Sequence, residues 1–166
     1  MMKINMCKPE LEVTEVTKTN DPECGYNDVD ELFLDTLNHI RDVERVMSAV
    51  GGYVEEIGEW HDWSKLKYFN EFQKDCLERL STPEFKKRSW YNIHTVKERH
   101  HINSNCPEDV NLFDLIEMIA DCVVAGKTRS GEVKEEFLVV PDEVISKAYY
   151  NTVKLMSSKI VVKDDE

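Results

Sequence analysis

Residues 56–69 read EIGEWHDWSKLKYF and place His61 beside Asp62 at the end of a helical run. Adjacent residues of an α-helix point about 100° apart, so these two side chains do not share one surface stripe. They must converge on something that lies between them. The neighbouring Trp60 and Trp63 are apolar enough to bury the pair. We interpret His61 and Asp62 as ligands of a metal ion.

The composition restricts the class of protein. The 166 residues carry a net charge of −12. Such a surface repels nucleic-acid backbones and anionic membranes, which argues against a nucleic-acid partner. The sequence has no apolar stretch of the ~18 residues that a membrane span needs, and its start lacks the apolar core of a signal peptide. We therefore expect a cytoplasmic protein without a membrane partner.

The cysteines predict neither a disulfide framework nor a zinc ribbon. Their number is odd and no two have CxxC spacing, so we expect reduced thiols. They are Cys7, Cys24, Cys76, Cys106 and Cys122.

The spacing of apolar residues predicts an all-α fold, a compact single-domain bundle of about six helices. Gly51-Gly52 is expected to end the first long helix, and Ser81 to cap the fourth, with Pro83 and Glu84 in its first turn. A turn, KTRSG, is expected after the fifth helix. The expected helices cover residues 27–50, 53–61, 69–80, 81 to beyond 94, 112–126 and 141–159.

The remaining segments are expected to be irregular. Residues 1–27 are polar and contain a turn at 20–22, so they predict an N-terminal arm. Residues 28–160 form the predicted helical domain, and residues 161–166 an acidic C-terminal tail. HHINSNCPEDVN, at residues 100–111, is typical of a loop. No strand is expected.

Histidines and carboxylates recur within the helical region, which holds all five histidines of the chain. Asp121 follows Glu117 by one turn in the apolar run LIEMIADCVVAG, residues 115–126. An unpaired carboxylate on such a helix is costly and needs a partner or a cation. Imidazole and carboxylate without cysteine favour Mn, Co, Ni, Zn, Mg or Fe. We expect one or two divalent ions.

The order and spacing of these histidines and aspartates resemble those of the HD superfamily of metal-dependent phosphohydrolases. His39, then His61-Asp62, then Asp121 is similar to the superfamily's H…HD…D pattern. The match is closest to a small, uncharacterised branch found in phages and bacteria, and covers residues 32–126. In that branch HD-x-SK is followed by an EF pair, a tryptophan, a histidine, an HH pair and EMI-x-D. The matching residues are His61-Asp62-Trp63-Ser64-Lys65, Glu71-Phe72, Trp90, His94, His100-His101 and Glu117 to Asp121.

The resemblance implies a hydrolase of the HD-domain type that cleaves a nucleotide or related phosphoester with a metal-activated water, in a bacterial or phage-infected cytosol. Catalytic roles are expected for Asp62, Lys65 and Glu117, with Glu117 orienting a ligand or a water. Assembly into a homo-oligomer is compatible with it. The expected metal ligands are His39, His61, Asp62, Asp121, His94, His100 and His101. The expected substrate-binding residues are Lys65, Arg99, Lys127 and Arg129.

Glu98-Arg99 departs from the pattern of this branch, which has asparagine and proline just before its HH pair. The difference concerns the rim of the substrate site. Taken alone, His39 could equally be a hydrogen-bonded histidine of the core, and Lys65 could be an ordinary charged residue of the surface. His94, His100 and His101 also fit a solvent-facing helix end, where the helix dipole favours cations.

Two other functions fit the same residues. Some HD-type proteins hold a di-iron centre and act as oxygenases, so this chain is also compatible with that activity. Alternatively, the chain is a non-catalytic module in which a metal joins helices or the pocket only binds a nucleotide.

Overall fold

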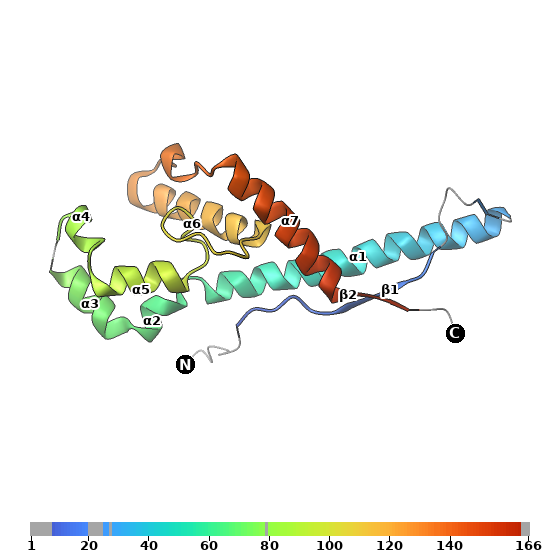
Figure 1. The fold of residues 1–166 in the computed structure, drawn as a ribbon, viewed down its shortest axis with the longest axis horizontal. Coiled ribbons are helices and arrows are strands. Elements are labelled where there is room, and N and C mark those ends of the chain that lie inside the picture. The colour runs from blue at the N-terminus through green and yellow to red at the C-terminus, as the bar shows by residue number, and fades with distance from the viewer. Residues whose placement is uncertain (1–7, 20–24, 27, 79, 164–166) are drawn as a thin grey trace. The chain divides into compact units, whose positions relative to one another are not determined.

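The structure is a computed structural model that describes residues 8–19, 25–26, 28–78 and 80–163 (Figure 1). The turn predicted at 20–22, the Asn27 cap, two of the cysteines (Cys7 and Cys24) and the end of the acidic tail lie outside the described residues. By its internal contacts the chain forms two compact units, residues 1–57 with 154–166, and residues 58–153. Each unit is described in turn.

The first unit is built on helix α1, Val29–Trp60, whose last turn belongs to the second unit. The sequence predicted two helices separated at Gly51-Gly52, and this prediction is wrong because α1 continues through both glycines. A glycine inside a helix costs only about 0.5–1 kcal/mol relative to alanine. Established helix on both sides outweighs that penalty, because propagation is easier than nucleation.

A two-stranded parallel sheet completes the first unit. Strand β1, Thr14–Thr17, pairs with β2, Ile160–Lys163, with Thr14 opposite Ile160. β2 directly follows helix α7, Asp142–Lys159. No strand was predicted, but threonine, valine and isoleucine favour extended backbone, and the two segments supply each other's hydrogen bonds. The Thr17 amide also donates to Asp42 of α1, at 2.7 Å, which ties the sheet to the helix.

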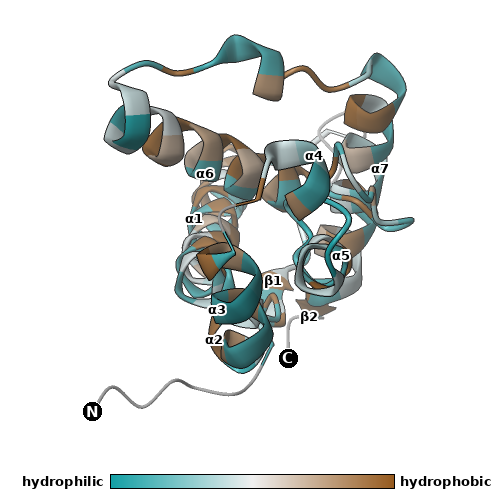
Figure 2. Ribbon diagram, turned by 90° about the vertical axis from the view of Figure 1, so that its left-hand side faces the viewer, coloured by the Kyte–Doolittle hydropathy of each residue, from teal (hydrophilic) through white to brown (hydrophobic). Residues whose placement is uncertain are grey.

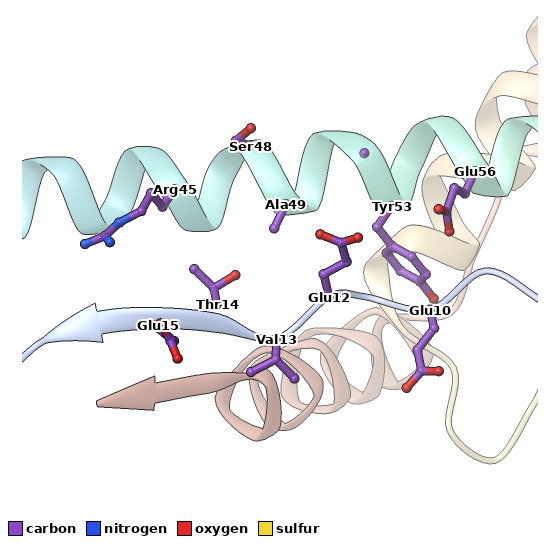
Figure 3. A pocket seen from close by; sticks show the side chains of 11 residues that line it. Glu10, Glu12, Val13, Thr14, Glu15, Arg45, Ser48, Ala49, Tyr53 and Glu56 are labelled. Atoms are coloured by element: carbon purple, nitrogen blue, oxygen red, sulfur yellow. The ribbon is translucent and has the colours of Figure 1, made fainter. Parts of the chain in front are cut away.

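A hollow of about 660 Å³ lies between α1 and the chain around β1 (Figure 3). Glu12 and Thr14 face it from the strand side, and Ala49 and Tyr53 from α1. Four glutamates line it against one arginine, Arg45. Arg45 pairs with the buried Asp42, Glu10 pairs with Lys159 and Glu15 with Lys163, so the acidic character of the hollow comes from Glu12 and Glu56.

The second unit is formed by helices and the loops between them. After the end of α1 come α2 (Trp63–Lys67), α3 (Phe69–Leu77), α4 (Thr82–Phe85), α5 (Ser89–Lys97), α6 (Leu112–Ser130), a 3₁₀ turn (Glu135–Phe137) and the first part of α7. The predicted all-α class is confirmed, and so is the predicted loop at residues 100–111.

Several helix boundaries differ from the predictions: α2 was not predicted, and α3 ends at Leu77 instead of residue 80. Ser81 forms the predicted capping box with Glu84, but the helix it opens ends at Phe85 and a separate helix starts at Ser89. α6 passes the expected end at Gly126 and stops at Gly131, which has φ 79°. The predicted KTRSG turn is therefore mostly the last turn of α6, because Gly131 supplies the left-handed C-cap.

The buried core of the second unit lies between α6, α7 and the 100–111 loop. It comprises Ile102, Val110, Leu115, Met118 and Ala148. Polar and apolar segments alternate along α6 in Figure 2, as expected for a helix with one buried face. None of the helices in the described residues is long and apolar enough to cross a bilayer.

Replacing Gly51 by alanine should stabilise the protein by about 0.5–1 kcal/mol, because a Cβ there meets no atom within 4 Å and the helix loses less entropy on folding. Gly131→Ala should instead destabilise by about 1 kcal/mol, since alanine disfavours φ 79°. Urea unfolding followed by circular dichroism measures both. A lower stability for Gly51→Ala would show that α1 needs the glycine.

Candidate metal centre

The candidate site begins at the junction between α1 and α2, where Asp62 has φ 59° and ψ 21°. It is the one non-glycine residue with positive φ in the part of the chain that the structure describes. Aspartate and asparagine adopt this left-handed conformation more readily than other residues with a side chain. The turn separates His61 from α2 and directs the Asp62 carboxylate towards α5 and the residues that follow it.

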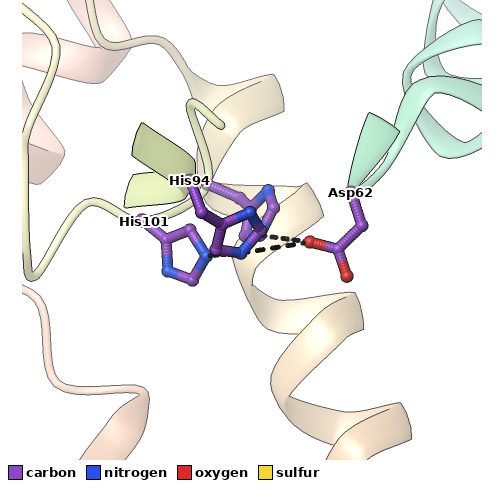
Figure 4. A group of neighbouring side chains, drawn as sticks. Asp62, His94 and His101 are labelled. Carbon is purple, nitrogen blue, oxygen red and sulfur yellow. Dashed lines mark hydrogen bonds and ion pairs between the residues drawn. The ribbon is translucent and has the colours of Figure 1, made fainter. Parts of the chain in front are cut away.

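Three imidazoles surround one oxygen of Asp62 (Figure 4). Asp62, His94, His100 and His101 each offer a ligand atom within 4.8 Å of the others. Asp62 Oδ1 lies 3.4 Å from His94 Nε2 and 3.8 Å from His100 Nε2. The Nε2 atoms of His94 and His101 are 2.7 Å apart. We call these four residues the histidine group.

Two atoms of the histidine group are buried without a hydrogen-bond partner in the described residues, Asp62 Oδ1 and His100 Nε2. Leaving such atoms unsatisfied costs about 1–3 kcal/mol each, more for a charged one. A cation between them would satisfy both, and imidazole with carboxylate suits zinc and other first-row metals. The residues present therefore fit a bound metal ion.

The His94 and His101 side chains are neutral. Burial, together with the neighbouring His101, lowers the pKa of His94 to about 3. Burial likewise lowers the pKa of His101 to about 4, with a contribution from His100. Neutral imidazole is the form that binds a metal. The 2.7 Å contact between the two Nε2 atoms is a hydrogen bond, so a bound metal would replace the proton that the two rings share.

Glu117 of α6 holds two imidazoles in place. Its Oε1 lies 3.0 Å from His61 Nδ1 and 2.9 Å from His100 Nδ1. Although these three residues also lie close enough to hold an ion, both distances are those of N–H···O hydrogen bonds. If both Nδ1 atoms carry the proton, each Nε2 lone pair is free to face a metal. Burial would raise the pKa of Glu117, but the bonds from His100 and His61 lower it.

His94 is supported from behind by two residues that the sequence analysis did not assign to the site, Ser64 and Glu98. Ser64 Oγ lies 2.7 Å from His94 Nδ1, and the Ser64 amide donates to Glu98 Oε1 at 2.8 Å. Burial raises the pKa of Glu98. Trp90 stacks on the His94 ring, with centroids 4.8 Å apart. The only signal in the sequence was the serine of the HD-x-SK match.

The other oxygen of Asp62 faces cations. Asp62 Oδ2 lies 3.3 Å from His61 Nε2 and also pairs with Lys65. His61 Nε2 lies 3.6 Å from Asp121 Oδ1. The carboxylates of Asp121, Asp62 and Glu117 raise the pKa of His61 to about 11. Burial would raise the pKa of Asp62, but hydrogen bonds from His61 and Lys65 hold it below its usual range.

Arg99, a predicted substrate-binding residue, contacts two aspartates. Its Nε and Nη2 donate to the two carboxylate oxygens of Asp114, at 2.7 and 2.8 Å, and its Nη1 donates to Asp109. Asp114 also completes the capping box of Asn111 at the start of α6. Arg99 therefore fixes the segment that carries His100 to the helix that carries Glu117.

The remaining predicted site residues are not all brought together. His39 is an exposed residue of α1 in the first unit and belongs to neither group of ligand atoms. Lys127 is exposed, with its Nζ 3.5 Å from the Gly131 carbonyl oxygen, and does not line the cavity beside the site. Arg129 does line that cavity. Lys65 pairs with Asp62, so it lies at the site as predicted.

The chain belongs to a family described as a family of unknown function (DUF5662), whose model matches residues 28–156. No curated protein and no solved structure matches the chain. No activity is known for this family.

The metal-free protein should become less stable as the pH falls from 6.5 to 5. In the unfolded chain His94 and His101 bind protons near pH 6.5, but in the folded chain their pKa values of about 3 and 4 keep them neutral. His61 acts in the opposite sense, because its raised pKa adds stability below pH 6.5 that is lost as the pH approaches 11. The His61 contribution is nearly complete below pH 6.5, so the slope in this window comes mainly from His94 and His101.

Thermal unfolding in EDTA between pH 7 and 5 tests this, with His101→Gln as the comparison. The variant should show a shallower loss of Tm, because one of the two histidines is gone. An equal slope in both proteins would contradict the assignment of neutral, buried imidazoles.

His100→Gln should weaken Mn²⁺ binding by at least about 100-fold, since it removes a ligand and its hydrogen bond to Glu117. The matched control is His39→Gln, the same change at the histidine outside the group. Isothermal titration should find that control within about twofold of the parent protein. Similar losses in both variants would restore His39 as a ligand.

Proposed function

We propose that this protein is a metal-dependent phosphohydrolase that acts on a nucleotide or a related phosphoester. The observation that carries the proposal is a pair of buried atoms without a hydrogen-bond partner in the described residues, Asp62 Oδ1 and His100 Nε2, inside a group of imidazoles. The resemblance of the sequence to the HD superfamily supports the same class of reaction. It stays an expectation, because the matching family has no known function.

The histidine group would hold one divalent cation, through Asp62, His94, His100 and His101. His61, Asp62 and Asp121 would hold a second, with Asp62 shared between the two. When bound, such a cation lowers the pKa of water towards neutrality and polarises a phosphoryl oxygen. Binding at His61 Nε2 would displace the proton that Asp62 and Asp121 stabilise there.

The protein's own groups would orient the ligands and balance the charge. The Glu117 carboxylate accepts hydrogen bonds from Nδ1 of His61 and Nδ1 of His100. The Ser64 hydroxyl contacts Nδ1 of His94. Each contact fixes which ring nitrogen faces the centre. Trp90 covers one face of His94 and keeps water from it.

Lys65 is the cation best placed to meet a substrate phosphate. Its ammonium pairs with Asp62, and its side chain is 32% exposed, so it is held at the site yet open to solvent. A phosphate group that approached the centre would meet this ammonium as a point charge. In a chain with net charge −12, that local cation would offset the general repulsion of a polyanion.

Asp62→Asn should reduce phosphate release by at least about 10²-fold while the fold persists. Asparagine tolerates the left-handed backbone at this position and keeps the volume, so the substitution removes mainly the charge. The measurement is phosphate release from a panel of nucleotides with Mn²⁺, Co²⁺, Ni²⁺ or Mg²⁺, together with the Tm of the same samples.

Two results would contradict the proposal. If the parent protein releases no phosphate with any metal while chelation lowers its Tm steeply, the metal is a structural link between helices. If aerobic purification yields a coloured, iron-loaded protein without phosphatase activity, an oxygenase is the better assignment.

A further inference from the structure

A cavity of about 560 Å³ adjoins the metal centre within the second unit. Three residues of the centre, His100, His101 and Asp121, are part of its lining. The volume falls in the range of about 300–1,000 Å³ that is usual for small-molecule sites. The candidate metal ligands thus lie at the wall of a space much larger than a phosphate ion.

The cavity extends along one face of α6. Asp121, Cys122, Ala125, Gly126 and Arg129 all line it, at the spacing of residues on one side of a helix. Eight residues at 1.5 Å each place Arg129 about 12 Å along the helix from Asp121. A ligand that contacts both ends must therefore be extended.

Three cations line this cavity, Lys86, Arg129 and Lys134. None of them forms a salt bridge with a carboxylate in the described ranges, whereas Arg88 and Arg99 of the same unit do. The one carboxylate in the lining is Asp121, which belongs to the metal centre. Cations left without acidic partners in a chain of net charge −12 indicate a place for an anion.

Two aromatic rings, Tyr91 and Phe137, also line the cavity. The Asn103 side chain donates to the Phe137 carbonyl oxygen at 3.3 Å, which joins the 3₁₀ turn to the 100–111 loop. Lys134 Nζ lies 5.9 Å from the centre of the Phe137 ring. Flat, apolar faces beside cations suit a ligand that combines an aromatic ring with anionic groups.

Gly126 determines how closely the segment carrying Lys134 and Phe137 approaches α6. A Cβ at this position would lie 2.6 Å from the Glu132 carbonyl oxygen and 3.1 Å from the Val133 Cα. Both are backbone atoms, so any larger residue would push the segment away from the helix. The glycine therefore preserves the cavity wall that carries Lys134 and Phe137.

We infer that this cavity binds the substrate of the metal centre, and that the substrate is a nucleotide with a second phosphate group, which Arg129 and Lys134 contact. The inference rests on the proposed function, because it assumes that the metal centre cleaves an ester at one end of the substrate. The affinity for the second phosphate is a separate property, because it depends on residues outside the metal centre.

The test compares the binding of two probes, adenosine 3′,5′-bisphosphate and adenosine 5′-monophosphate, to the manganese-loaded protein by isothermal titration. The parent protein should prefer the bisphosphate by at least about tenfold, the value of one good charge-assisted hydrogen bond. The double variant Arg129→Gln, Lys134→Gln should reduce this preference to within about threefold. Lys127→Gln, the same change at an α6 residue outside the cavity lining, should retain it.

Gly126→Ala offers a second variant that changes no charge. It should also reduce the preference, because the backbone at residues 132–133 must move. The inference is overturned if the parent protein binds neither probe, if it shows no preference, or if the double variant and Lys127→Gln behave alike.

Failure of the inference can be distinguished from failure of the proposed function. Hydrolysis of bis(p-nitrophenyl) phosphate that Asp62→Asn abolishes, without any bisphosphate preference, would leave the phosphohydrolase proposal standing and overturn the substrate inference. A bisphosphate preference that depends on Arg129 and Lys134, in a protein that hydrolyses no ester, would support the cavity as a binding site and contradict the catalytic proposal.

Discussion

The two oxygens of the Asp62 carboxylate face two different environments, and the site depends on this arrangement. Oδ1 lies among the imidazoles of the histidine group and has no hydrogen-bond partner in the described residues, whereas Oδ2 pairs with Lys65 and lies near His61. Burying a charge is costly unless it is compensated. The compensation on the Oδ2 side keeps Asp62 ionised, and the ionised oxygen on the other side is what attracts a cation to the histidine group.

The surrounding residues keep the imidazoles in position for that carboxylate. Glu117 of α6 orients His61 and His100. Arg99 fixes the segment that carries His100, because it binds Asp114 at the start of the same helix. A site assembled from a turn, a short helix and a loop would otherwise be mobile. Hydrogen bonds to a rigid helix of 19 residues supply the precision that metal binding requires.

Local sequence patterns predicted the elements whose apolar stripes are strong, such as α6 and α7, and they identified most of the residues that meet at the site. Local patterns failed where the structure depends on contacts between residues that are far apart in the sequence. The pairing of β1 with β2 joins the two ends of the chain, and no local rule shows it. The sequence showed Glu98 only as a departure from the family pattern, but it is buried and accepts a hydrogen bond from the Ser64 amide at the site. His39 fitted a family pattern, but the structure does not bring it into either group of ligand atoms.

Anomalous X-ray diffraction from crystals soaked in Mn²⁺ tests the central claim most directly, because it locates the metal without assuming any activity. We expect a peak bounded by Asp62 Oδ1 and the Nε2 atoms of His94, His100 and His101. Manganese bound only at exposed carboxylates, such as those that line the acidic hollow beside α1, would contradict it.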